Sequence, residues 1–152
     1  MIRPGHDMTV GQLFAANAHY FPNEPAVVLA DETRTHAELY RRGCRFASAV
    51  AELGLRKQDR IAIISTNNIE FIETYVGAWS SGFVVATVNF RLALAEWLYI
   101  LNDLAPRMLV IEAQYIEHLP ALRAGVSAIE HVVVIGGEAG DAHSFAALID
   151  GA

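Results

Sequence analysis

The sequence predicts an α/β fold built on a mostly parallel sheet with helices on both faces. Four continuous apolar runs, IAIIS, FVVAT, MLVIE and HVVVI, begin near residues 61, 83, 107 and 131. Segments whose apolar residues recur at helical spacing separate these runs. Strands that are apolar throughout are typical of parallel sheets buried on both faces, and their alternation with helices indicates Rossmann-like βαβ units.

The N-terminal part is expected to hold a leader, a helix and a small β-hairpin. Residues 1–8 are read as a flexible leader. Thr9 and Gln12 have the spacing of a capping box, which predicts a helix that runs to just before the next proline. The runs AVVLA and TRT predict two short strands, with the turn between them at Asp31 and Glu32.

A long helix is expected next, because Thr35 and Glu38 form a second capping box and Gly54 supplies a left-handed end. Its apolar residues form one stripe: Leu39, Gly43, Phe46, Val50 and Leu53. The charged residues off this stripe are expected to form a solvated face: Arg41, Arg42, Arg45 and Glu52. Cys44, the only cysteine, is expected to be a small buried core residue. A single thiol excludes an internal disulfide and fits a reducing compartment.

Helices are also expected between and after the four strands. The first begins at Asn67 or Asn68 and ends at Gly82. Pro106 ends the next helix, because proline cannot continue the hydrogen-bonding pattern. The later helices are expected over residues 94–103, 115–122 and 145–149. No linker rich in Pro, Gly or Ser divides the chain, which therefore forms one domain or part of one.

Composition and charge argue against several classes of function. The 152 residues are 53% hydrophobic, and the net charge is −6 with no basic cluster, which argues against nucleic-acid binding. The first residues lack the apolar core of a signal peptide, and no apolar run approaches the roughly 18 residues of a membrane-spanning helix. A cytoplasmic protein without a membrane span is expected.

Ligands of parallel α/β sheets bind beyond the carboxyl ends of the strands. Four loops are expected there, over residues 66–68, 88–92, 113–114 and 136–143. The last contains three glycines but does not spell G-x-G-x-x-G, and no lysine follows that would make it a P-loop. We therefore interpret it as an ordinary turn rather than a nucleotide site.

Asn89 and Arg91 are the side chains of most interest in these loops. A guanidinium at the carboxyl end of a strand suits phosphate or carboxylate. The helix that follows begins after Ala93, which offers no capping oxygen, so Asn89 is a candidate to brace the turn. Taken alone, the residues favour a structural role for Arg91, such as a salt bridge.

No catalytic group or metal site is indicated by the residues themselves. Asp141 and His143 are two ligands of mixed type, which is fewer than a metal site needs. Glu70 and Glu73 share one helix face at i, i+3 and are expected to be solvated. Neither G-x-S-x-G nor H-E-x-x-H is present.

The order of segments from Thr9 to Ala147 resembles the opening of the acyl-adenylate-forming enzymes, the AMP-forming acyl-CoA synthetases and ligases. The landmarks are Thr-x-x-Glu-Leu at Thr35, Asp59-Arg60 before a strand, Asn before the helix that holds Glu70-Phe71, Gly82 before a strand, Asn-x-Arg-Leu at Asn89, and Tyr-Ile-Leu-Asn-Asp at Tyr99. Each motif is weak alone, but their order and spacing together are specific.

Three positions depart from the family pattern. Gln58 stands where the family usually has Gly, Thr66 where it has Pro, and Ala93 where it has Thr or Ser. All three concern turns or helix caps, so they bear on local stability rather than on membership.

The resemblance implies that residues 9–152 are the first part of a large N-terminal domain. The Ser/Thr/Gly-rich phosphate loop ending in Pro-Lys-Gly and the catalytic lysine of the family would come later. The implied reaction joins a carboxylic acid to AMP with ATP and Mg²⁺, and then transfers the acyl group to a thiol, commonly CoA. In CoA-using relatives the loop matching Arg91 lies near the CoA nucleotide, so Arg91 is expected to contact a CoA phosphate.

The fragment alone is expected to be inactive, with the remainder of the same polypeptide as its partner and dimers forming through exposed apolar surface. The alternative is a stand-alone Rossmann-like binding or interaction module without catalysis. A nicotinamide-binding domain is a third alternative, against which the missing glycine fingerprint argues. The acyl substrate cannot be read from these residues.

Overall fold

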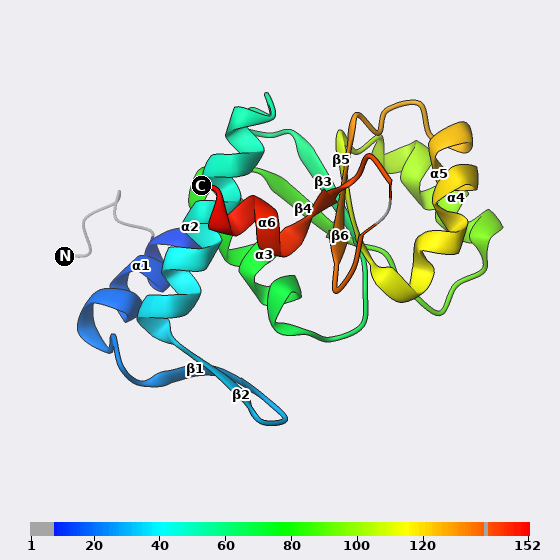
Figure 1. The fold of residues 1–152 in the computed structure, drawn as a ribbon. Coiled ribbons are helices and arrows are strands. Elements are labelled where there is room, and N and C mark those ends of the chain that lie inside the picture. Colours follow the sequence, from blue (N-terminus) through cyan, green and yellow to red (C-terminus); the bar gives the residue numbers. More distant parts are fainter. Residues whose placement is uncertain (1–7, 139) are drawn as a thin grey trace.

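A five-stranded, fully parallel sheet forms the centre of the molecule (Figure 1). The computed structural model describes residues 8–138 and 140–152. The sheet order is β4-β3-β5-β6-β7. The strands are β3 (Arg60–Ile64), β4 (Val84–Thr87), β5 (Met108–Glu112), β6 (His131–Ile135) and β7 (His143–Ser144). The four predicted strands and the α/β class are confirmed; β7, with two residues, is too short to leave an apolar pattern.

Helices cover both faces of the sheet, as predicted (Figure 1). One face packs against α2 (His36–Glu52), α3 (Ile69–Ser81) and α6 (Phe145–Asp150), and the other against α4 (Leu94–Leu104), η1 (Ala113–His118) and α5 (Leu119–Gly125). Successive residues of a strand point to opposite faces. Ile61 and Ile63 accordingly enter the first core, whereas Ala62 and Ile64 enter the second.

The N-terminal elements lie to one side of the sheet. Helix α1 (Val10–Tyr20) and helix α2 both begin with the predicted capping boxes. Strands β1 (Pro25–Leu29) and β2 (Glu32–Thr35) form the predicted antiparallel hairpin. The expected leader, apart from the exposed Met8, lies outside the described residues.

The hairpin turn is one residue earlier than predicted. Leu29 pairs with Glu32, so Ala30 and Asp31 form the turn and Glu32 belongs to β2. Ala30 adopts φ 50°, a left-handed conformation that disfavours a residue with a Cβ atom. The prediction was wrong because it assigned the apolar Ala30 to the first strand and the charged Glu32 to the turn, whereas the register of the two strands decides which residues form the turn.

The helix predicted over residues 115–122 is in fact two elements, the 3₁₀ helix η1 and the α-helix α5. Pro120 stands in the first turn of α5. Proline has no N–H to donate to the residue four positions earlier, so a continuous α-helix through this point is disfavoured. It is tolerated in a first turn, where that N–H would have no intrahelical partner.

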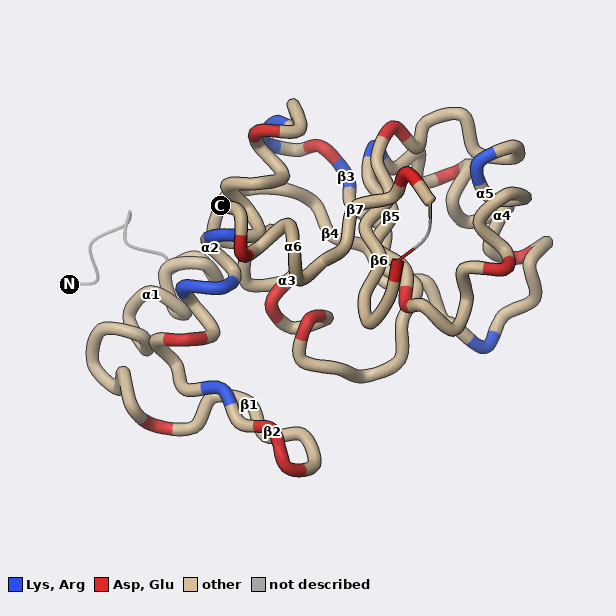
Figure 2. Tube along the Cα trace, in the orientation of Figure 1, with Lys and Arg blue, Asp and Glu red and all other residues tan. Residues whose placement is uncertain are grey.

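The contact between α2 and α3 contains a buried ion pair. The side chain of Glu73 is fully buried, and its Oε1 accepts from Arg42 Nε. The prediction of a solvated face for Glu70 and Glu73 was therefore wrong for Glu73, and Arg42 is paired rather than free. Figure 2 shows basic residues along α2 and acidic residues in the N-terminal half of α3. Their opposite charges meet where the two helices pack.

None of the helices within residues 8–138 and 140–152 is both long and apolar enough to cross a membrane.

Candidate functional site

The carboxyl edge of the sheet brings three of the predicted loops together. Strand β3 lies between β4 and β5, so the turn after β3, the loop after β4 and the end of β5 are neighbours. The fourth predicted loop, after β6, approaches the same edge: a Cβ atom on Gly137 would lie 2.8 Å from Cβ of Ala113. This edge is the position at which α/β sheets bind ligands.

The loop between β4 and α4 is held by its own side chains. Asn89 Oδ1 accepts from the backbone N of Arg91 at 3.0 Å, which confirms that Asn89 braces the turn. The indole Nε1 of the buried Trp97 donates to the carbonyl oxygen of Asn89 at 2.9 Å. The backbone N of Ala93, the residue before α4, donates to Oε2 of Glu96 at 2.8 Å. Although Ala93 has no side-chain oxygen to cap the helix, its own N–H is thus satisfied by the third helical residue.

Arg91 is exposed at the tip of this braced loop. Its guanidinium carbon lies 5.2 Å from the centre of the Phe90 ring, a cation–π arrangement. Among the residues that the structure describes, no carboxylate lies within 4 Å of its nitrogen atoms. The salt bridge that the residues alone favoured therefore has no partner in this part of the chain. Within residues 8–138 and 140–152 the guanidinium of Arg91 makes no hydrogen bond, so its donors are available to an anion.

An open hollow of about 320 Å³ lies between the β3–α3 turn and the β4–α4 loop. Its walls combine polar and aromatic side chains, a lining suited to a ligand with both characters. The lining residues are Ser65, Asn67, Phe71, Tyr75, Thr87, Val88, Asn89 and Phe90.

Glu112, the last residue of β5, is the polar centre of this edge. Its Oε2 accepts from the backbone N and hydroxyl of Thr66, at 2.7 and 2.8 Å, and from the hydroxyl of Ser65 at 2.9 Å. Burial raises the pKa of this carboxyl group, but the hydrogen bonds from Thr66 and Ser65 outweigh it, so the pKa is lowered. The carboxylate is therefore held in its charged form.

Tyr115 stands near both charged side chains of this edge, Glu112 and Arg91. Desolvation raises the pKa of the Tyr115 phenol, the negative charge of Glu112 raises it further, and the positive charge of Arg91 lowers it. Its ring also lies 6.0 Å from the ring of Phe90. A cation, a carboxylate and two aromatic rings thus share one end of the sheet.

The family departures at this edge have local compensations. The helix α3 is capped by Asn68, one of the two predicted candidates, whose Oδ1 accepts from Phe71 N at 2.8 Å. Thr66, in the place where the family usually has Pro, makes two hydrogen bonds that proline cannot make. At both departures on this edge, Thr66 and Ala93, the backbone N donates to a glutamate side chain, that of Glu112 and that of Glu96.

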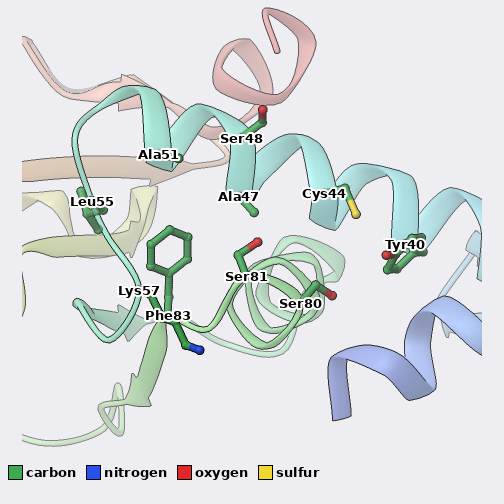
Figure 3. Close-up of a pocket in the computed structure, with 10 residues that line it drawn as sticks. All are labelled: Tyr40, Cys44, Ala47, Ser48, Ala51, Leu55, Lys57, Ser80, Ser81 and Phe83. Carbon is green, nitrogen blue, oxygen red and sulfur yellow. The ribbon is translucent and has the colours of Figure 1, made fainter. Parts of the chain in front are cut away.

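A second hollow lies between α2 and α3, close to the segments that precede β3 and β4 (Figure 3). Cys44 lines it together with Tyr40, Lys57 and the hydroxyl groups of Ser80 and Ser81. The prediction of a buried core cysteine was therefore wrong, because the thiol is partly exposed on the wall of this hollow. The hollow lies at the amino ends of the strands, away from the edge at which parallel sheets bind ligands.

The described part of the chain contains no group of three metal-ligating side chains. Asp141, considered with His143 as a metal ligand, instead pairs with Arg123 at 2.7 Å.

Comparison with known proteins identifies the family. The sequence profile of the AMP-binding enzyme family matches residues 14–147. The chain is 35% identical over 105 residues to the 3-methylmercaptopropionyl-CoA ligase of Ruegeria lacuscaerulensis, covering 68% of this chain and 20% of that protein. It is 34% identical over 116 residues to the benzoate–CoA ligase of Thauera aromatica, covering 76% of this chain and 22% of that protein. The chain thus spans about a fifth of the length of these curated relatives.

Solved structures agree with this result. The fatty acyl CoA synthetase of Mycobacterium tuberculosis superposes with a TM-score of 0.84 at 26% identity, over 95% of this chain and 28% of that one. A long-chain-fatty-acid–CoA ligase of Archaeoglobus fulgidus superposes with a TM-score of 0.87 at 22% identity, over 99% of this chain and 31% of that one. At this low identity, the match is evidence for a shared fold only. The profile match, the sequence identities and the fold together show that this chain belongs to the AMP-binding enzyme family.

Proposed function

We propose that this chain is the first part of the large domain of an acyl-activating ligase that uses CoA. In that reaction a carboxylate attacks the α-phosphate of ATP, which gives an acyl-adenylate and pyrophosphate, and a CoA thiol then takes the acyl group and releases AMP. ATP and Mg²⁺ would be held by later parts of the polypeptide, and the 152 residues alone are expected to be inactive. The family match and the named CoA ligases among its relatives support this proposal.

Within this reaction, the role of the carboxyl edge is to bind the CoA nucleotide, with Arg91 contacting a phosphate. The observation that carries this role is the combination of a fixed loop and a guanidinium without a carboxylate partner among the described residues. A planar guanidinium donates to two phosphate oxygens at once, and a preformed loop loses little entropy on binding. The neighbouring hollow offers aromatic rings for the remainder of the nucleotide.

The test is Arg91→Ala in the ligase that contains this chain. Losing a charge-assisted contact to phosphate is expected to raise the KM for CoA about tenfold, while formation of the acyl-adenylate is unchanged. Arg91→Lys should recover only part of the loss, because an ammonium cannot form the planar pair of hydrogen bonds. Arg45→Ala, an exposed change on α2, is the matched control. An unaltered KM for CoA in Arg91→Ala would contradict the role of Arg91.

The exposed apolar side chains near the β4 edge are explained by the same proposal. Strand β4 ends the sheet, Val84 on it is 44% exposed, and Trp79 of α3 is 41% exposed. We infer that the remainder of the same polypeptide covers this surface, because the relatives are about five times longer than the matched part. The isolated chain should then form dimers with rising concentration in analytical ultracentrifugation. A monomer at all concentrations would favour a stand-alone binding module.

The carboxylic acid substrate and a cytoplasmic location stay predictions.

A further inference from the structure

The carboxylate of Glu112 accepts four hydrogen bonds, more than any other carboxylate in the described residues. Three converge on Oε2, from Ser65 and Thr66 across the sheet, and Gln114 Nε2 donates to Oε1 at 2.6 Å. The donors Ser65 and Thr66, in the turn that follows β3, lie 47 and 46 positions away in the sequence. Glu112 thus ties the turn that follows β3 to the end of β5.

The network continues from Glu112 into helix α3. The hydroxyl of Ser65 accepts from Asn68 Nδ2 at 2.7 Å, and Asn68 caps the first turn of α3 through Phe71 N. Ser65 is buried, with 5% of its surface exposed, so its hydroxyl depends on these partners. One carboxylate therefore fixes the start of the turn directly and its end through Ser65 and Asn68.

This turn is one wall of the hollow beside Arg91. Ser65, Asn67 and Phe71 line it on one side, and Thr87, Asn89 and Phe90 on the other. The second wall is fixed independently, through Asn89 and the indole of Trp97. The separation of the two walls, and so the shape of the hollow, depends on where Glu112 holds the first wall.

We propose that Glu112 is a positioning residue that sets the β3–α3 turn as the wall of the ligand hollow opposite Asn89 and Phe90. The proposal rests on the proposed function in one respect, that the ligand of the hollow is CoA. Two of the four hydrogen bonds come from Thr66, where the family usually has proline, so this way of holding the turn belongs to the present sequence.

Positioning and simple charge predict opposite effects on an anionic ligand. Glu112 ends β5 and Arg91 lies in the loop after β4, at the same edge of the sheet, so the negative charge of Glu112 opposes an anion at Arg91. Removing a negative charge would strengthen CoA binding if Glu112 acted only through its field. If Glu112 acts by holding the turn, removing its side chain weakens CoA binding. The turn would then be mobile before CoA binds, and ordering it on binding would reduce the net free energy of binding.

The experiment is a titration of the 152-residue chain with CoA, followed by backbone amide NMR shifts. Glu112→Ala is expected to raise the dissociation constant of CoA about tenfold. This is the change in an equilibrium constant that accompanies the loss of one hydrogen bond to a charged group. Glu112→Gln keeps the shape of the side chain and is expected to show a smaller rise in the same direction. Glu117→Gln, an exposed carboxylate of the same segment, is the matched control and should change nothing. Tighter or equal binding of CoA by both Glu112 variants would overturn the positioning role.

A second readout does not require CoA. In the unliganded chain, the Thr66 amide shift should follow the titration of Glu112 with a pKa below its ordinary value of 4.5, and this response should vanish in Glu112→Gln. Hydrogen exchange at the backbone amides of Thr66, which donates to Glu112, and of Phe71, which donates to Asn68 Oδ1, should become faster in that variant by about tenfold.

The two readouts separate the two proposals. If the chain binds no CoA, or if Arg91→Ala leaves CoA binding unaltered, the proposed role of this edge in CoA binding fails. Amide exchange at Thr66 and Phe71 then tests whether Glu112 positions the turn. Unchanged amide exchange in Glu112→Gln would overturn the positioning role whatever the ligand.

Discussion

Arg42 Nε on α2 lies 2.5 Å from Oε1 of Glu73 on α3, and the Glu73 side chain is fully buried. Arg34 Nε approaches the same oxygen at 3.7 Å, whereas Oε2 of Glu73 has no hydrogen-bond partner among the residues that the structure describes. Burial raises the pKa of Glu73, and Arg42 opposes that rise without cancelling it. The carboxyl group therefore holds its proton more firmly in the folded protein than in the unfolded chain.

The first prediction concerns the dependence of stability on pH. Between the ordinary pKa of 4.5 and the raised pKa of the folded state, the native protein binds more protons than the unfolded chain. The contribution of Glu73 to stability is therefore fully present below pH 4.5 and is lost as pH rises through this window. Glu73→Gln removes this dependence, so its free energy of unfolding should improve relative to wild type as pH rises.

Urea unfolding at several pH values measures this difference. Glu52→Gln, an exposed change on α2, is the control and should run parallel to wild type. A difference between Glu73→Gln and wild type that stays constant with pH would show that the pKa of Glu73 is the same in the folded and unfolded states.

The second prediction concerns the close approach of α2 and α3. A Cβ atom at Gly77 would lie 2.5 Å from the carbonyl oxygen of Gly43 and 2.9 Å from Cδ1 of Phe46. Gly77→Ala is expected to destabilise the protein by about 2 kcal/mol, because backbone cannot move aside and overpacking exceeds the gain in helix propensity.

Gly43→Ala is the matched comparison. Its Cβ atom would meet mainly the side chain of Val76, with Cγ1 at 2.6 Å. Adding Val76→Ala should therefore offset part of the cost of Gly43→Ala, which a double-mutant cycle measures as a favourable coupling. If the losses of stability in Gly43→Ala and Val76→Ala simply add in the double variant, α2 and α3 have moved apart instead of repacking around the new methyl group.

The third prediction concerns Gln58, where the family usually has glycine. Gln58 adopts φ 74°, a left-handed conformation, while its backbone N donates to the carbonyl oxygen of Gly82. Gln58→Gly should stabilise the protein by about 1 kcal/mol, because the relief of strain exceeds the entropy that glycine adds to the unfolded chain. Gln58→Ala retains the Cβ atom and should change little. Thermal unfolding ranks the three proteins, and equal stability of Gly and Ala variants would contradict the prediction.

The fourth prediction concerns Trp97, whose Nε1 donates to the carbonyl oxygen of Asn89. Trp97→Phe keeps most of the buried ring but loses this hydrogen bond, at an expected cost of about 1–2 kcal/mol in urea unfolding. Because the loop loses a tether, CoA binding should weaken as well. Phe145→Leu, a core change in α6 on the other face, is the control. It should lower stability without altering the affinity for CoA, and equal losses of affinity in both variants would contradict a specific role of the tether.

The fold could be predicted largely from periodicity and caps, since every apolar residue of IAIIS, MLVIE and HVVVI is buried and Thr9, Thr35 and Asn68 cap helices. Glu73 was misjudged, although the sequence held a signal. It lies four residues after Ile69 and three before Val76, on the buried stripe of α3. Carboxylates are rarely buried without a partner, and Arg42 could not be assigned as that partner before the packing of α2 on α3 was known.

The candidate site could be predicted only in part. Asn89 and Arg91 were found because they are neighbours in one loop, and the structure confirms the brace between them. Glu112 was missed because its partners Ser65 and Thr66 lie far away in the sequence. Their meeting depends on β5 lying beside β3, an order of strands that the pattern of apolar residues does not encode. The exposure of Cys44 depends in the same way on the position of α3.

The coding sequence beyond the codon for Ala152 tests most directly the claim that this chain opens an acyl-activating ligase. We predict that the same reading frame continues and soon encodes a Ser/Thr/Gly-rich loop that ends in Pro-Lys-Gly. A stop codon directly after Ala152 would contradict the proposed ligase function and leave a stand-alone binding module on the same scaffold.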